Sequence, residues 1–160
     1  CEAWDEGRSV IILSHSMGTF IAYDVLWCFS HRSESKYRKY RRQSVDLLVT
    51  MGSPLGDPVL RDQMLVERWE KASKSNAKSQ RQRYYPLNIC RWHNYSAYGD
   101  IVCHDGSLKD DFFDGMCANV NDRKISHMRD YRQLYNPYIR PDAAEVVTEA
   151  CSYVWRVTFA

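Results

Sequence analysis

The sequence predicts an α/β fold with a mostly parallel sheet and flanking helices. Two short apolar runs, residues 9–13 and 45–51, suit strands that are buried on both faces of a sheet. Between them, residues 17–29 repeat apolar side chains at a spacing of three to four, which is typical of an amphipathic helix. Strand, helix and strand within about 45 residues form a βαβ unit, so we expect parallel strands and a right-handed crossover.

Later segments continue this alternation of helices and strands. Residues 59–72 place apolar side chains on one face and predict a helix, and residues 87–95 resume strand character. A further short strand is expected near residues 118–125. Pro141 is suited to open a final helix, because an apolar stripe follows over residues 146–155. The α/β pattern therefore extends along most of the chain.

Basic charge is concentrated in the middle of the chain. The net charge is only +2, but residues 31–83 carry thirteen basic and six acidic side chains, a net +7. Tyrosines interleave with the basic residues of 32–42, which permits binding to nucleic acid by charge and stacking. Neither this stretch nor 71–83 matches a nucleic-acid-binding module, so we expect no nucleic-acid partner. We interpret 31–43 as a surface loop and 73–83 as a flexible basic insertion.

Composition excludes several other classes of protein. The 160 residues are 44% apolar and 26% charged with five Pro and seven Gly, which excludes collagen-like and low-complexity chains. No apolar run reaches the roughly 18 residues of a membrane-spanning helix, so no integral membrane association is expected. The six cysteines are irregularly spaced, and the Cys90–His93 and Cys103–His104 pairs lack a second closely spaced ligand pair. We expect no metal site and no cofactor.

The most informative segment is the turn between the first strand and the first helix. Ser16 occupies this turn, with Gly18 two residues after it and Ser14 two residues before it. A serine there is often a helix N-cap, but a small residue on each side is typical of a nucleophile elbow, because strand and helix pass close together. Gly18 meets this pattern and Ser14 meets it approximately, since Gly is common there. Such a turn would place the Met17 backbone N–H where an oxyanion forms.

Four segments resemble α/β-hydrolase-fold serine hydrolases of the esterase and lipase type. Residues 11–26 look like the elbow strand and helix of that family, and residues 48–56 are similar to its next strand and loop. Family members place an acid after a later strand and a histidine after the last one. Residues 92–102 are similar to the acid-bearing segment, and residues 124–131 to the histidine-bearing segment.

The resemblance implies a Ser16, His127 and Asp100 triad. Ser16 would be the nucleophile, and His127 would take its proton and later deliver that proton to the leaving group. Asp100 would orient the imidazole and stabilise its charged form, while Asp105 is the alternative acid. The Met17 N–H would be one oxyanion donor, and metal would have no part in the reaction.

The implied function is cleavage of a carboxylic ester or related acyl substrate through an acyl-enzyme. The partner would then be a small acyl or lipid ester, and the triad does not distinguish esters from thioesters, lipids or amides. The loop that usually supplies the second oxyanion donor has no counterpart here, so residues 1–160 resemble the C-terminal part of an α/β-hydrolase fold, one incomplete domain. The alternative is a catalytically inactive hydrolase-like domain that acts as a binding module. No oligomeric state is predicted.

Overall fold

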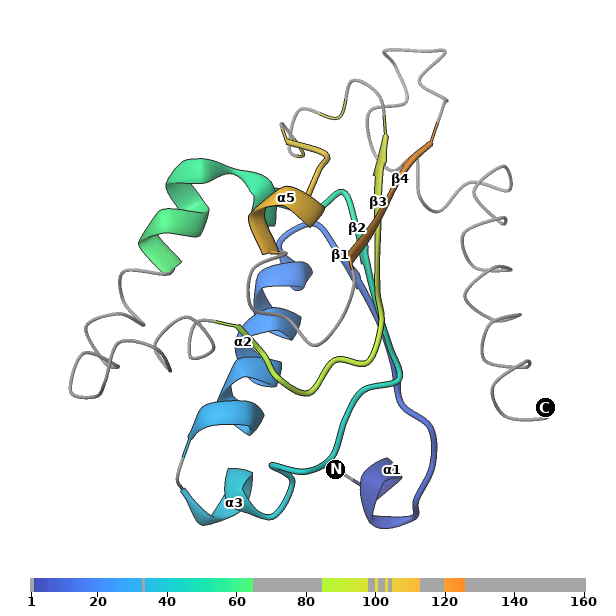
Figure 1. Cartoon of the computed structure of the whole chain (residues 1–160), viewed down its shortest axis with the longest axis vertical. Helices are drawn as coiled ribbons and strands as arrows, with labels where there is room; N and C mark the ends of the chain where they lie inside the picture. The colour runs from blue at the N-terminus through green and yellow to red at the C-terminus, as the bar shows by residue number, and fades with distance from the viewer. Residues whose placement is uncertain are drawn as a thin grey trace.

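The computed structural model describes residues 2–32, 34–64, 85–97, 100, 103, 105–112 and 120–125 (Figure 1). The elements within them, in chain order, are α1 (Glu2–Asp5), β1 (Ile11–His15), α2 (Gly18–His31), α3 (Ser35–Arg38), β2 (Leu47–Met51), η1 (Pro54–Gly56), a helical segment over residues 58–64, β3 (Trp92–Ala97), α5 (Lys109–Phe112) and β4 (Val120–Ile125). None of the helices in these residues is long and apolar enough to cross a bilayer.

The described strands form a parallel sheet in the order β1-β2-β3-β4. The register pairs Ile12 with Leu48, Leu48 with Trp92, and Trp92 with Val120, so one row of apolar side chains crosses the sheet. Helix α2 connects β1 to β2 and lies against one face of the sheet, on the same side as α5 in Figure 1. This arrangement confirms the predicted α/β fold with a parallel sheet.

The main core fills the space between α2 and the sheet. Tyr23 and Leu26 from α2 are buried in one cluster with Leu48, Trp92 and Phe112. The Tyr23 ring makes an edge contact with Phe112, with centroids 5.7 Å apart, which aromatic rings prefer to direct stacking.

The opposite face of the sheet buries a smaller apolar cluster. Leu47, Val49, Tyr95 and Ala97 belong to it. Since Leu47, Leu48 and Val49 are all fully buried, β2 is covered on both faces. Two-sided burial explains why this strand is an unbroken apolar run in the sequence.

Three predicted segments differ from the structure. The first strand, expected over residues 9–13, is β1, which covers Ile11–His15. The strand expected over residues 87–95 is β3, which begins only at Trp92, and Ile89 forms an isolated parallel bridge with Val45. The loop expected over residues 31–43 contains the single helical turn α3. This turn is held through Tyr37 and Tyr40, whose rings both make edge contacts with Phe29 of α2.

The basic stretch around α3 lies at the end of the sheet where the strands begin, as Figure 1 shows. Part of its charge is compensated there, because Lys39 Nζ lies 2.6 Å from Asp5 Oδ1 and Arg32 pairs with Glu34. The Tyr40 hydroxyl also donates to Asp5. These contacts tie α1 to the segment that the sequence marks as basic.

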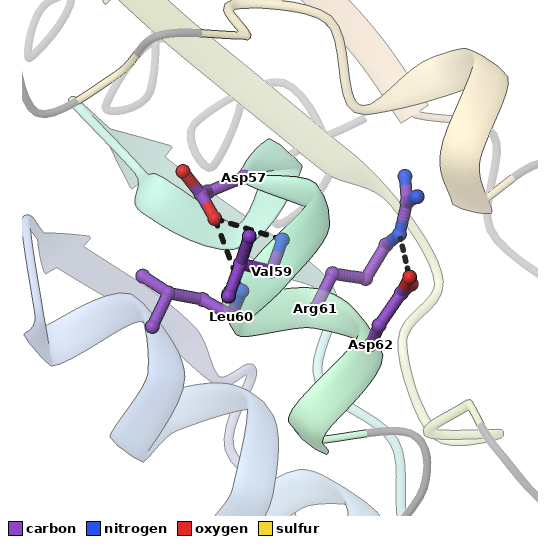
Figure 2. Close-up of polar contacts among 5 residues, drawn as sticks. All are labelled: Asp57, Val59, Leu60, Arg61 and Asp62. Carbon is purple, nitrogen blue, oxygen red and sulfur yellow. Dashed lines mark hydrogen bonds and ion pairs between the residues drawn. The ribbon is translucent and has the colours of Figure 1, made fainter.

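The loop after β2 leads through η1 into the helical segment of residues 58–64. Asp57 caps this segment, because its Oδ1 accepts from the N–H groups of Val59 and Leu60 at 3.0 Å each (Figure 2). One turn later Arg61 and Asp62 are also paired. The described part agrees with the helix predicted from residue 59, whereas its end, the basic insertion 73–83 and the helix after Pro141 lie outside the described residues.

Candidate active site

Ser16 lies in the turn between β1 and α2 with φ of 52°. Among the described residues, it is the single position other than glycine with a positive φ. A side chain in this region is strained by about 1–3 kcal/mol, and such strain persists only where the surrounding structure enforces it. Ser16 is half-buried at the carboxyl end of β1.

Ser16 does not cap α2. The N-cap position is occupied by Met17, with φ −58° and ψ −23° and no side-chain capping bond. None of the hydrogen bonds within the described part of the chain uses the Ser16 hydroxyl. The alternative of an ordinary capping serine therefore does not account for this residue.

The backbone of Ser16 is held on both sides. Its N–H donates to the Met51 carbonyl at 2.9 Å, which ties the turn to the end of β2. Its carbonyl oxygen accepts from Thr19 Oγ1 at 2.7 Å and from the Thr19 N–H at 3.0 Å. These bonds connect the strained turn to the neighbouring strand and to the first turn of α2.

Ser53 links the loop after β2 to the same turn. Its Oγ accepts from the Leu55 N–H at 3.2 Å, which agrees with a loop-capping serine. The same hydroxyl donates to Thr19 Oγ1 at 2.9 Å, and both side chains are fully buried. Thr19 carries no signal in the sequence, because its partner Ser53 is 34 residues away.

The small residues that flank Ser16 play different parts from those expected. Ser14 is buried, and its hydroxyl donates to the Val49 carbonyl on β2 at 3.0 Å, so this position accommodates a serine in place of glycine. A Cβ added to Gly18 would meet nothing within 4 Å. The close approach expected at Gly18 is thus not seen among the described residues.

Met17 occupies the N-cap position of α2. The first N–H groups of a helix have no partner within the helix, so they are available to an anion. The Met17 side chain is 58% exposed and lies beside Ser16 at the surface. Its role as an oxyanion donor stays a prediction.

Both candidate acids follow β3 and lie in short turns. Asp100 Oδ1 accepts from the Cys103 N–H at 3.3 Å, and Asp105 Oδ1 accepts from the Ser107 N–H at 2.9 Å. Asp105 lies against the loop after β2, because a Cβ added to Gly56 would be 2.7 Å from the Asp105 carbonyl oxygen. Each carboxylate is only partly buried.

The carboxylates in and near these turns contribute to a raised pKa of the Cys103 thiol. Burial, and then the charges of Asp100, Asp105 and Asp122, raise the pKa of the Cys103 thiol to about 11. Cys103 therefore stays protonated at neutral pH and is a poor nucleophile. This leaves Ser16 as the better candidate nucleophile on this edge of the sheet.

A buried polar network supports the loop that contains Asp105. Trp92 Nε1 donates to Thr50 Oγ1, which donates to Asn94 Oδ1, and Asn94 Nδ2 donates to Asp122 Oδ1, each at 2.9 Å. The Asp122 carboxylate also accepts from the N–H groups of Leu108 and Lys109 and from the Ser107 hydroxyl. No pattern in the sequence predicts this network, which connects β2, β3 and β4.

The chain topology brings the candidate residues to one edge of the sheet. Ser16 follows β1 and Asp100 follows β3, and the carboxyl ends of parallel strands meet at the same edge. His127 comes two residues after the end of β4 and lies outside the described residues. The described residues contain no group of three His, Cys, Asp or Glu side chains that could hold a metal ion.

The model of one protein family, the PGAP1-like alpha/beta domain, matches residues 2–106. The match includes Ser16, Met17 and both candidate acids, and His127 lies beyond it. No curated protein and no solved structure matches the chain. The family and the parallel sheet with flanking helices agree on an α/β-hydrolase fold. The chain belongs to the PGAP1-like alpha/beta domain family.

Proposed function

We propose that this chain is a serine hydrolase domain that cleaves a carboxylic ester or related acyl substrate, with Ser16 as the nucleophile. The observation that carries the proposal is the φ of 52° at Ser16, in the turn between a parallel strand and a helix. Glycine would adopt this conformation without strain. A serine that retains the strain, and whose hydroxyl caps nothing in the described residues, supports a role for the side chain itself.

The proposed reaction begins with attack of Ser16 Oγ on the substrate carbonyl carbon. His127 accepts the hydroxyl proton, and the carbonyl oxygen becomes an oxyanion beside the Met17 N–H. When the carbon–oxygen bond to the leaving alcohol breaks, His127 returns the proton to that alcohol, and an acyl-enzyme remains. Water, activated by His127, then attacks the acyl carbon and releases the acid and free Ser16.

Asp100 is the proposed acid of the triad. It would accept a hydrogen bond from the His127 ring and stabilise the imidazolium that forms in each step. Its Oδ1 accepts from the Cys103 N–H, which holds the carboxylate in the turn after β3. Asp105 is the alternative, because it follows the same strand and is held by a similar turn.

A fluorophosphonate probe tests the nucleophile directly, because it phosphonylates an activated serine and no other hydroxyl. We expect the folded full-length protein to be labelled and Ser16→Ala to abolish labelling. Ser9→Ala is the matched control, since Ser9 is exposed and lies just before β1. It should leave labelling unchanged. A folded full-length protein that takes up no probe would contradict the proposal and favour a binding module.

A further inference from the structure

Thr19 and Ser53 form a directed chain of hydrogen bonds that ends on Ser16. The Leu55 N–H donates to Ser53 Oγ, Ser53 Oγ donates to Thr19 Oγ1, and Thr19 Oγ1 donates to the Ser16 carbonyl oxygen. A hydroxyl has one proton to donate, and the last member of the chain is a carbonyl oxygen that can only accept, so Thr19 donates to Ser16 and Ser53 donates to Thr19. The bond to Ser16 is the shortest, at 2.7 Å.

The two hydroxyl groups are sealed from solvent. Thr19 and Ser53 are each 0% exposed, so each hydroxyl relies on protein groups for its hydrogen bonds. Hydrogen bonds in such a chain polarise one another, and a buried chain is sensitive to the loss of any member. The bond on Ser16 therefore depends on Ser53 as well as on Thr19.

The Ser16 carbonyl and the Met17 N–H belong to the same peptide group. This group is planar and trans, so its C=O and N–H bonds point in opposite directions and turn together. Holding the Ser16 oxygen against Thr19 consequently fixes the direction of the Met17 N–H. Donation to a peptide oxygen also polarises the N–H of that peptide, which makes it a stronger donor.

We infer that Thr19 and Ser53 are positioning residues that orient the Met17 N–H toward the reacting carbonyl. The inference rests on the proposed function of Ser16 and Met17. It also gives a physical reason for two sequence segments to act together, because the loop after β2 holds the elbow after β1 through one side-chain bond. Neither residue touches the substrate; both act through the Ser16–Met17 peptide.

Thr19→Val removes the hydroxyl and keeps the shape of the side chain. At saturating fluorophosphonate we expect the rate constant of labelling to fall about tenfold, because an oxyanion donor is misaligned rather than lost. Thr19→Ser should restore most of the rate, since it retains the hydroxyl. Ser53→Ala should slow labelling in the same way, and the double variant should be little slower than the slower single variant, because both act in one chain.

The matched control is Ser30→Ala. Ser30 is a buried hydroxyl on the same helix, within hydrogen-bond distance of the Leu26 carbonyl oxygen and of Asn88 Oδ1 and away from the elbow. Its loss should lower thermal stability and leave the labelling rate constant unchanged. The pH profile of labelling should be the same in all variants, because none of them alters the histidine that titrates.

A second measurement does not depend on activity. The amide resonance of Met17 in a nitrogen–proton NMR spectrum should shift in Thr19→Val and Ser53→Ala and stay in place in Ser30→Ala. If wild type is labelled, and the folded Thr19 and Ser53 variants are labelled equally fast with an unmoved Met17 amide, the inference is wrong. If the Met17 amide shifts but wild type takes up no probe, the proposed function fails while the contact itself stands. If Thr19→Val does not fold, Ser53→Ala carries the same test, because it removes the preceding hydroxyl of the same chain.

Discussion

Asn94 Nδ2 lies 2.9 Å from Asp122 Oδ1 and joins β3 to β4 through their side chains. Asn94 is fully buried, so this bond extends a buried polar network across β2, β3 and β4. Asp122 also accepts from the N–H groups at the start of α5, where a carboxylate interacts favourably with the helix. One carboxylate thus fixes a strand and the loop that contains Asp105.

Asp122→Asn should destabilise the fold markedly. The carboxylate accepts from several donors at once, and an amide in its place presents an NH₂ group to some of them. We expect the free energy of unfolding to fall by about 2–3 kcal/mol, the range for hydrogen bonds to a charged group. Urea denaturation measures this loss. Asp62→Asn is the control, because Asp62 is exposed and its pair with Arg61 should contribute less than about 1 kcal/mol. Equal stability of the two variants would contradict this role of Asp122.

One strand lies later in the chain than its apolar residues predict. Apolar continuity predicted both β1 and β2 as strands, but only β2 is buried on both faces; in β1 Leu13 is 51% exposed, so its expected two-sided burial is wrong. The strand expected over residues 87–95 is β3, which begins at Trp92 and ends at Ala97. Its polar residues are all buried, namely His93, Asn94 and Ser96. The partners of Asn94 come from other strands and are distant in sequence.

The candidate site, too, could be predicted from the sequence only in part. The elbow was predictable because strand, serine and helix are contiguous in the sequence. The bond between Thr19 and Ser53 was not, since it joins two segments only after the sheet has formed.

The stretch interpreted as a loop contains α3 because Tyr37 and Tyr40 pack against Phe29, a tertiary contact that no local pattern contains.

Ser14→Gly should weaken the fold and spare the site. It removes the bond from Ser14 Oγ to the Val49 carbonyl and adds backbone freedom to β1, so we expect a loss of about 1–2 kcal/mol in unfolding free energy. The labelling rate of Ser16 should change less than about twofold, because the backbone bonds of Ser16 to Met51 and Thr19 remain. A large loss of labelling with a small loss of stability would show that Ser14 acts in the site.

Gly56→Ala should lower the stability of the fold, whereas Gly18→Ala should preserve or raise it. A Cβ at Gly56 would be 2.7 Å from the Asp105 backbone oxygen, so the two loops must move apart, at a cost of about 1–3 kcal/mol. A Cβ at Gly18 meets nothing within 4 Å, and alanine favours a helix, so stability should hold or rise by up to about 1 kcal/mol. Thermal unfolding of both variants measures the difference. A destabilised Gly18→Ala would reveal a contact beyond the described residues.

Asp100→Asn and Asp105→Asn distinguish the two candidate acids. The amide keeps the shape of the carboxylate but removes its charge, so the true acid should lose at least about a hundredfold in labelling rate. We expect this loss for Asp100→Asn and a change of less than about threefold for Asp105→Asn. The bond from the Cys103 N–H is retained by the amide oxygen, which limits structural disturbance. The reverse ranking would assign the acid role to Asp105.

Cys103 should be resistant to alkylation and should make the fold sensitive to alkaline pH. Burial raises the pKa of its thiol to about 11 from an ordinary value of 9.0, with further contributions from nearby carboxylates. Iodoacetamide at pH 8 should therefore modify the exposed Cys90 long before Cys103. Between about pH 9 and 11 the unfolded chain has lost this proton while the folded chain retains it, so the free energy of unfolding falls as the pH rises. Cys103→Ala removes this contribution, and its stability should decline less than that of wild type over the same interval. Parallel decline of the two proteins, or equal alkylation of both cysteines, would contradict the raised pKa.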